Sequence, residues 1–197
     1  MAKGKTFIIS GPSGVGKSTV LHELFRGRDD LYFSISATTR APREGEVDGV
    51  HYHFIDVKRF QELIEEDALL EYAEYVGNFY GTPKKFVDKA MNEGKDVVLD
   101  IEVQGAIQVC TKRPETVRIF IAPPSWEELE RRLVSRGTDS EEKIQKRLVR
   151  AKAELRTADV YDNFVINDTD ERAVREVNAI MLAEHCKPAE RMKILSE

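Results

Sequence analysis

One short loop near the start of the chain constrains the fold more than any other feature. Residues Gly11–Ser18 read GPSGVGKS and fit the phosphate-loop pattern GxxxxGK[ST]. The apolar run before it, residues 6–9, is typical of a buried strand, and residues 19–25 after it carry apolar side chains at helical spacing. A glycine-rich turn arising by chance would not need these flanks or the Lys-Ser pair. The loop therefore predicts a site for the phosphates of a nucleoside triphosphate.

The chemistry of such a loop follows from its residue types. Glycines let the backbone fold tightly with its N–H groups turned inward, and the helix N-terminus adds positive potential. Lys17 can reach the β- and γ-phosphates, and the Ser18 hydroxyl can ligate Mg²⁺. The predicted triphosphate-binding residues are Gly11, Pro12, Ser13, Gly14, Val15, Gly16, Lys17, Ser18 and Thr19.

The composition limits the classes of protein to which the chain can belong. Its 197 residues suit one compact domain, and a net charge of −5 argues against a nucleic-acid-binding surface. No apolar stretch approaches the length of a membrane span, and the N-terminus lacks the apolar run of a signal peptide. Cys110 and Cys186 have no partner at metal-ligand spacing and are expected to be reduced thiols. We expect a cytoplasmic protein that does not bind membranes.

Hydrophobic periodicity alternates between strands and helices, which is typical of an α/β fold with a parallel sheet. We expect strands at residues 6–9, 32–36, 51–55, 69–76, 96–101, 117–122 and 163–167. We expect helices at residues 19–25, 57–66, 83–92, 140–157 and 171–184. A further helix is expected to begin after Ser125, its N-cap, and to end near residues 136–138. Residues 36–82 and 126–157 have the character of insertions on a nucleotide-binding core.

Two further groups of residues carry possible chemistry. Asp100 ends an apolar strand, which is the form of a carboxylate that holds Mg²⁺ beside a phosphate loop, and Glu102 follows two residues later. Farther upstream, two arginines (Arg40 and Arg43) and two tyrosines (Tyr52 and Tyr80) suit a phosphate monoester. A buried glutamate near hydroxyl groups, such as Glu71, suits the donor edge of a base. Composition alone slightly favours a surface loop with core aromatics for this region.

Together these stretches resemble the guanylate kinases. The matching segments are residues 11–18, 38–43, 77–82, 100–105 and 136–147, in the order of the family. The resemblance implies a three-layer α/β phosphate-loop kinase core with a parallel sheet, a mixed α/β GMP-binding insertion and a helical lid. The core would comprise residues 1–35, 83–125 and 158–197, the GMP-binding region residues 36–82, and the lid residues 126–157. The implied reaction is Mg²⁺-dependent transfer of the ATP γ-phosphate to GMP.

The resemblance also implies a role for individual residues. Arg40, Arg43, Tyr52 and Tyr80 would bind the GMP phosphate, and Ser36, Glu71 and Thr82 would read the guanine. Asp100 would serve the metal and the acceptor. Glu102 stands where family members commonly have aspartate, so its contact to guanine or acceptor is left open. Asn167 would lie near the adenine of ATP. Lys17, Arg43, Arg136 and Arg147 would stabilise the charge of the transferring phosphoryl group.

The reaction fits the absence of an obvious catalytic base, because a phosphate monoester with a second pKa of about 6 is already largely ionised at neutral pH. Two other functions remain open at this point. One is a kinase of the phosphate-loop class with a different acceptor, and the other is a guanylate-kinase-like domain that only binds proteins. The sequence leaves open the use of dGMP and whether the protein is a monomer or a homo-oligomer.

Overall fold

The computed structural model describes residues 3–135 and 140–192. In chain order, its elements are β1 (Thr6–Ser10), α1 (Lys17–Phe25), β2 (Leu31–Phe33), β3 (Ala37–Thr38), β4 (His53–Phe54), α2 (Val57–Glu65), β5 (Leu69–Tyr75), β6 (Asn78–Pro83), α3 (Lys84–Asn92), β7 (Asp96–Asp100), α4 (Val103–Lys112), β8 (Val117–Ala122), α5 (Trp126–Ser135), α6 (Glu141–Leu155), the 3₁₀ turn η1 (Ala158–Val160), β9 (Asn163–Ile166), α7 (Asp170–His185) and α8 (Pro188–Arg191). Within these residues, no helix is both long and apolar enough to cross a membrane.

The strands form two sheets, which confirms the predicted α/β class with a parallel sheet. The larger sheet has five strands in the order β2-β7-β1-β8-β9, and the smaller has four in the order β4-β3-β6-β5. Strands β1, β7 and β8 are buried along nearly their whole length. Continuous apolar runs of this kind are what a parallel sheet covered on both faces requires.

The chain divides into two compact units. One contains Asp29–Val117 with the described N-terminal residues through Ile8, and the other contains Ile9–Arg28 and the described residues from Arg118 onward. In the first unit, β2 pairs in parallel with β7, and β5 and β6 form an antiparallel hairpin. Val76 and Gly77 at its tip have φ values of 50° and 73°, which suit the tight turn of a two-residue hairpin.

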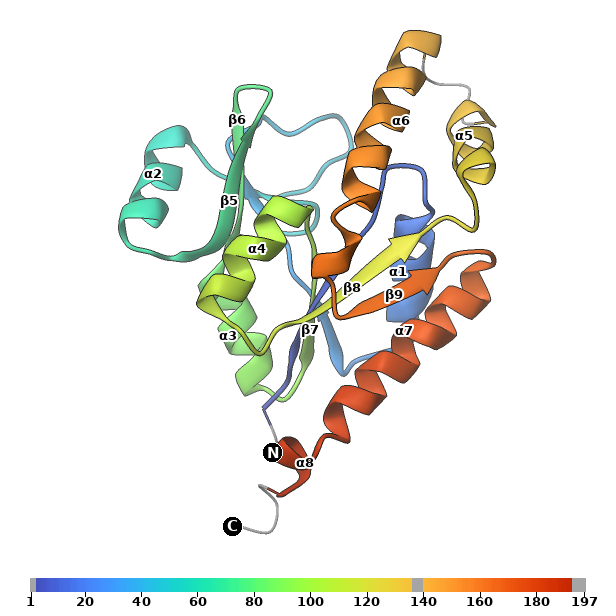
Figure 1. Cartoon of the computed structure of the whole chain (residues 1–197). Helices are drawn as coiled ribbons and strands as arrows, with labels where there is room; N and C mark the ends of the chain where they lie inside the picture. Colours follow the sequence, from blue (N-terminus) through green and yellow to red (C-terminus); the bar gives the residue numbers. More distant parts are fainter. Residues whose placement is uncertain (1–2, 136–139, 193–197) are drawn as a thin grey trace. The chain divides into compact units, whose positions relative to one another are not determined.

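Helix α2 packs on the small sheet through a compact apolar core (Figure 1). Ala37, Phe60 and Leu69 are buried there, from β3, α2 and β5, and Leu63 and Ile64 pack against them. Asp56 caps α2 by accepting a hydrogen bond of 2.7 Å from the Arg59 N–H. This apolar core therefore attaches α2 to one face of the small sheet.

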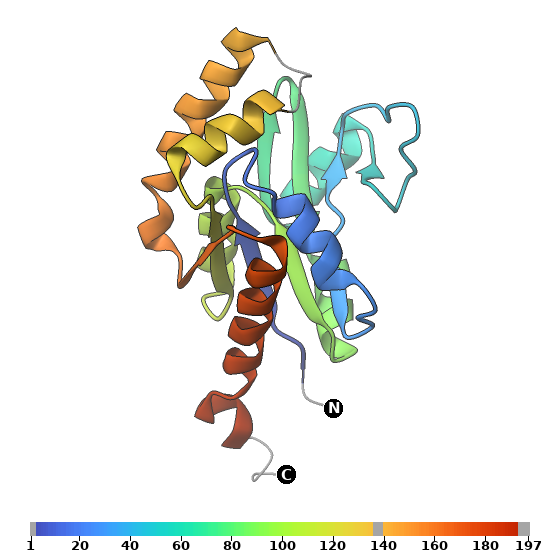
Figure 2. The same ribbon diagram turned by 90° about the vertical axis from the view of Figure 1, so that its right-hand side faces the viewer.

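The second unit contains the phosphate loop and two pairs of packed elements. Strand β8 pairs in parallel with β9, and α1 lies against α7. Helices α5 and α6 lie side by side, as Figure 2 shows, and bury Leu129, Leu133, Leu148 and Ala151 between them. The Ser125 hydroxyl accepts a 3.1 Å bond from the Glu128 N–H, which confirms the predicted cap of α5. The Glu128 carboxylate itself bonds to Arg131 and Arg132.

Some expectations from periodicity were wrong or incomplete. The strand expected at residues 32–36 ends at Phe33, and Ala37–Thr38 forms a strand of the other sheet. The strand expected at residues 51–55 is only His53–Phe54. Strand β6 and helices α4 and α8 were not expected at all. The helix end expected near residues 136–138 lies outside the described residues, and the three-part division into core, GMP-binding region and lid stays a prediction.

Candidate functional site

The phosphate loop adopts a conformation that needs its glycines. Gly16 has φ 93°, a region that other residues rarely adopt, and a Cβ there would lie 2.5 Å from Asn167 Nδ2. Gly14 has φ 91°, and a Cβ there would lie 2.7 Å from Leu133 Cδ2. Both the backbone conformation and the close neighbours therefore exclude a side chain at these positions.

Two side chains from distant parts of the second unit hold the carbonyl of Val15 in the loop. Asn167 Nδ2 donates a 2.8 Å hydrogen bond to Val15 O, and Arg132 Nη1 donates another of 2.9 Å. Arg132 Nη2 also donates to the Asn167 carbonyl at 3.0 Å, so the two side chains support each other. Asn167 is buried, and its Oδ1 has no hydrogen-bond partner among the described residues. Pattern reading could not single out Arg132, because it lies in a charged helix that resembles a solvated face.

Helix α1 starts directly at the end of the loop. Lys17 is its first residue, Gly16 is its N-cap, and no side chain of the described residues caps it. Ser18 and Thr19 lie in the first turn and are both exposed, whereas Lys17 is half-buried. An uncapped helix N-terminus that follows a tight glycine loop can bind an anion through its N–H groups and positive potential. The geometry agrees with the triphosphate role predicted for Gly11–Thr19.

In the first unit, Arg40 lies in a cluster with Tyr52 and Tyr80. The centre of its guanidinium is 5.5 Å from the Tyr52 ring centroid, and the two tyrosine rings meet edge to face at 6.0 Å. Burial raises the pKa of Tyr52, with smaller contributions from Tyr80, Glu46 and Asp100. Hydrogen bonds to Glu46 and then to Tyr80 raise the pKa of Arg40. The structure thus brings together three of the four residues predicted to bind an acceptor phosphate.

Glu46 orders this cluster, and the sequence did not identify it as a site residue. Arg40 Nη2 donates to Glu46 Oε1 at 2.7 Å, and the Arg43 N–H donates to Glu46 Oε2 at 2.7 Å. These bonds lower the pKa of Glu46 to about 2. The Arg43 side chain is exposed. Glu46 therefore positions both arginines, Arg40 through its side chain and Arg43 through its backbone.

Glu71 is a buried carboxylate, only 7% exposed. Thr82 Oγ1 donates to Glu71 Oε1 at 2.6 Å, and Thr82 is also buried. Burial raises the pKa of Glu71, and the negative charge of Glu102 adds to the rise, whereas the bonds from Thr82 lower the pKa. Thr82 and Tyr80 are two residues apart on β6 and so share a face of the strand. A carboxylate can accept more hydrogen bonds than the one from Thr82, so a buried one is suited to a ligand that presents N–H groups.

Besides burial, the charges of two more predicted residues of the first unit act on these groups, since Asp100 raises the pKa of Tyr52 and Glu102 that of Glu71. Asp100 is the exposed last residue of β7, and Glu102 is the N-cap residue of α4. Ser36 directly precedes β3, and its carbonyl accepts a 2.9 Å bond from the His53 N–H. In the second unit, Arg147 is a half-buried residue of α6. Arg136 lies outside the described residues.

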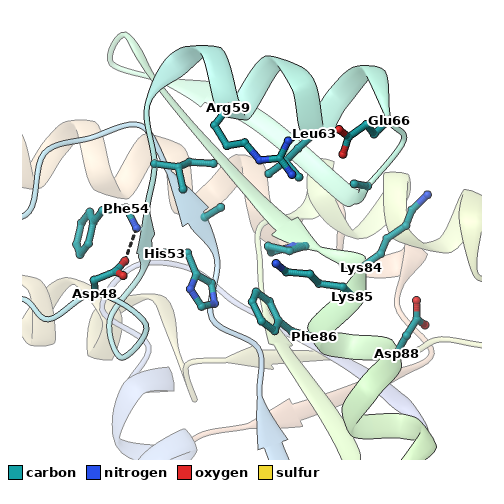
Figure 3. Close-up of a pocket in the computed structure, with 14 residues that line it drawn as sticks. Asp48, His53, Phe54, Arg59, Leu63, Glu66, Lys84, Lys85, Phe86 and Asp88 are labelled. Atoms are coloured by element: carbon teal, nitrogen blue, oxygen red, sulfur yellow. Dashed lines mark hydrogen bonds and ion pairs between the residues drawn. The ribbon is translucent and has the colours of Figure 1, made fainter.

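A cavity of about 480 Å³ in the first unit contains none of the predicted site residues. Figure 3 shows the residues that line it. Helix α2 and the residue after it contribute Arg59, Leu63 and Glu66, and α3 contributes Lys84, Lys85 and Phe86. The His53 ring stacks on Phe86 with a centroid distance of 4.4 Å, and burial lowers the pKa of His53. Because none of the predicted site residues line it, the volume of this cavity does not identify it as the predicted nucleotide-binding site.

Comparison with known proteins points to one family. The guanylate kinase family model matches residues 3–184. The chain is 54% identical over 186 residues to a guanylate kinase of Bacillus cereus, covering 94% of this chain and 91% of that protein. It is 54% identical over 182 residues to a guanylate kinase of Thermus thermophilus, covering 92% and 82%. The crystal structure of guanylate kinase from Anaplasma phagocytophilum superimposes with a TM-score of 0.75 at 33% identity, covering 96% and 90%.

Proposed function

We propose how the residues of this chain, which belongs to the guanylate kinase family, carry out the family's reaction. The protein is an ATP:GMP phosphotransferase, which converts ATP and GMP to ADP and GDP in purine nucleotide metabolism and GMP recycling. The observation that carries our assignment of the acceptor site is the buried Glu71 carboxylate with its bond to Thr82.

Glu71 reads the guanine base. Guanine presents an N1–H and an N2–H₂ donor side by side, and one ionised carboxylate can accept from both. Adenine lacks this donor pair and would leave the acceptor positions that Thr82 does not use unpaired, which costs about 10⁴-fold or more in specificity. Ser36 and Thr82 contact the base beside Glu71, and Glu102 contributes a second carboxylate on the guanine side.

The GMP phosphate binds to Arg40, Arg43, Tyr52 and Tyr80. The guanidinium groups supply charge-assisted hydrogen bonds, and the phenol groups add neutral donors. The acceptor oxygen is already largely ionised, because the second pKa of such a phosphate is about 6. The residues of this site therefore orient the acceptor and need not remove a proton from it.

The phosphate loop binds ATP. Its N–H groups and the α1 N-terminus hold the phosphates, and Asn167 holds the loop in shape and contributes to the adenine side. Lys17, Arg43, Arg136 and Arg147 stabilise the negative charge that spreads over the transferring group, which is the main task of the protein in phosphoryl transfer.

We propose that Ser18 and Asp100 each offer an oxygen atom of the type that magnesium prefers. Ser18 at the start of α1 offers a hydroxyl oxygen, and the exposed Asp100 at the end of β7 offers a carboxylate oxygen. Oxygen ligands of this kind, few in number and completed by phosphate oxygens and water, are what Mg²⁺ prefers. When bound, the ion neutralises phosphate charge during transfer.

A panel of acceptors tests this assignment. We expect the kcat/KM for GMP, measured as ATP-dependent ADP release, to exceed that for AMP, CMP or UMP by about 10⁴-fold or more, because only guanine satisfies Glu71. Including dGMP shows whether the 2′-hydroxyl contributes. Comparable rates with AMP and GMP would rule out the role of Glu71.

The affinity for GMP should depend on pH through Glu71. The bound base needs the ionised carboxylate, and the raised pKa of Glu71 means that protons compete for it at a higher pH than for an ordinary glutamate. As the pH is lowered from 7.5 to about 5, towards the ordinary glutamate range, we expect the advantage of the wild type over Glu71→Gln in KM for GMP to shrink. Because the GMP phosphate titrates equally in both proteins, the ratio of their KM values for GMP reports only the ionisation of Glu71. A ratio that stays constant over this range would contradict the prediction.

Asn167→Ala should weaken ATP binding. The substitution removes the Nδ2 donor to Val15 O, so we expect KM for ATP to rise about tenfold and stability to fall by about 1–3 kcal/mol. KM for GMP should change little. Steady-state kinetics and urea unfolding measure the two effects. Asn163→Ala, at the start of β9, is a matched control that should leave KM for ATP unchanged, and an unchanged KM in Asn167→Ala would separate Asn167 from the loop's function.

The protein's other partners follow from the reaction. We propose that it acts on free nucleotides, as a monomer or homo-oligomer, without nucleic acid or membrane. We place it in the cytoplasm, where the thiols of Cys110 and Cys186, which form no disulfide in the described part of the chain, stay reduced.

A further inference from the structure

We propose that Gly105 is a specificity-determining residue for the acceptor base, because its missing side chain leaves the space that the Glu71 carboxylate occupies. Gly105 would not touch the substrate. It acts as a positioning residue through Glu71, and the inference rests on the proposed role of Glu71 in reading guanine.

The contact between the two residues is close and specific. Gly105 is a buried residue in the first turn of α4, and Glu71 reaches it from β5. A Cβ at Gly105 would lie 3.0 Å from Glu71 Oε2, 3.3 Å from Cδ and 3.4 Å from Cγ. The three nearest atoms all belong to one side chain. A methyl group at this position would therefore meet the carboxylate before anything else.

The backbone gives no other reason for a glycine here. Gly105 is not among the glycines with positive φ in the described residues, and it lies within a regular helix. In such a place alanine is the better residue, since glycine lowers helix propensity. The chain thus has a residue that weakens α4 at the position where the helix meets the Glu71 carboxylate.

Helix α4 cannot easily move away to admit a methyl group, because it is tied to β5 on the same face. Gln108 Nε2 donates to Tyr72 O at 3.0 Å, and the Tyr72 N–H donates to Gln108 Oε1 at 3.2 Å. One turn later, Lys112 Nζ donates to Leu69 O at 2.7 Å. Residues 105, 108 and 112 follow the i, i+3, i+7 spacing of one helix face. The side chain of Glu71 must therefore yield instead.

The carboxylate is held on both sides in the present structure. Thr82 Oγ1 donates to Oε1 at 2.6 Å, and on the other side the Cβ position of Gly105 is 3.0 Å from Oε2. Displacing Oε2 by a few tenths of an ångström would turn the carboxylate or stretch its bond to Thr82. The two hydrogen bonds to guanine depend on distance and angle, so their alignment would suffer.

The test is Gly105→Ala, with GMP affinity measured by calorimetry and by steady-state kinetics. We expect the Kd and KM for GMP to rise about tenfold, with KM for ATP within about twofold and an unchanged or higher Tm, because alanine favours the helix. Thr111→Ala, on the exposed side of α4 and with a similar gain in helix propensity, should bind GMP as the wild type does. A Gly105→Ala protein that binds GMP like the wild type would overturn the inference.

A double-mutant cycle with Glu71→Asp shows whether Gly105 acts through Glu71. Aspartate withdraws the carboxylate from Gly105 by one methylene, so Gly105→Ala should change GMP affinity less than about threefold in that background, as coupled neighbours do. Equal fold-changes in both backgrounds would overturn the inference. If Gly105→Ala fails to fold, the double variant should recover the Tm, and a double variant that stays unfolded overturns it as well.

Glu71→Gln separates this inference from the function on which it rests. If Glu71→Gln binds GMP normally, the guanine-reading role of Glu71 fails, and the role of Gly105 fails with it. If Glu71→Gln loses GMP affinity and Gly105→Ala does not, only the role of Gly105 is rejected. Loss of affinity in both, with the expected coupling, supports both assignments.

Discussion

Lys17→Met should lower kcat by about 10³-fold or more while the protein remains folded. Methionine keeps much of the length and the apolar stem of lysine but removes the charge that meets the β- and γ-phosphates. Loss of a single group that stabilises developing charge commonly costs about 10²–10³-fold in rate. We expect a larger effect here because Lys17 lies at the start of α1, directly beside the phosphates that the loop is predicted to hold.

The measurement is ADP release at saturating ATP and GMP, with circular dichroism and Tm as checks on folding. Lys58→Met, at an exposed position of α2, makes the same chemical change away from the phosphate loop and should leave kcat within about twofold of the wild type, as ordinary surface substitutions do. A folded Lys17→Met enzyme with nearly normal kcat would remove Lys17 from the transfer step.

Glu71→Gln should raise KM for GMP by about 10²–10⁴-fold, since hydrogen bonds to a charged group contribute about 1.5–3 kcal/mol each and two are at stake. The glutamine amide can still accept one bond, but its NH₂ group opposes the second donor of guanine. KM for ATP should change by less than about threefold, because glutamine leaves the phosphate loop untouched. Similar rises in both Michaelis constants would remove Glu71 from the base-reading site.

The same substitution should not destabilise the protein at neutral pH. The pKa of Glu71 is raised in the folded state, so the fold binds its proton more tightly than the unfolded chain does. Stability therefore falls as the pH rises from the unfolded pKa of about 4.3 through the folded one, and the ionised carboxylate costs stability above that range. A neutral glutamine avoids this cost. An unchanged or higher Tm at pH 7.5 would show that the lost GMP affinity is not a folding defect.

The sequence predicts many residues of the acceptor site, but not the contacts that these residues make with one another. The sequence identified Arg40, Tyr52 and Tyr80, and the structure brings them together. It did not identify Glu46, which bonds to Arg40 and to the Arg43 N–H, because an acidic residue in a loop rich in turn residues gives no signal of its own. The roles in substrate binding remain predictions that the variants above test.

The missed elements have a common physical cause. Strand β6 contains glycine and ends in proline, and helix α4 contains a glycine in its first turn. Both residues weaken local propensity, so pattern reading passes over the segments that contain them. Tertiary pairing compensates, since β6 lies between β3 and β5 and α4 is bonded to β5.

The sequence by itself determined the phosphate loop, the α/β class and the types of residue available for catalysis. These features depend on contiguous residues, because a tight glycine loop, a strand or a helix follows from local backbone preference and periodicity. Only the tertiary structure decided that Asn167, 152 positions from Val15, holds the loop carbonyl, and that Gly105 makes room for Glu71. Such contacts join groups that local preference cannot link, and they exist only once the folded chain has brought the two groups into van der Waals or hydrogen-bond range.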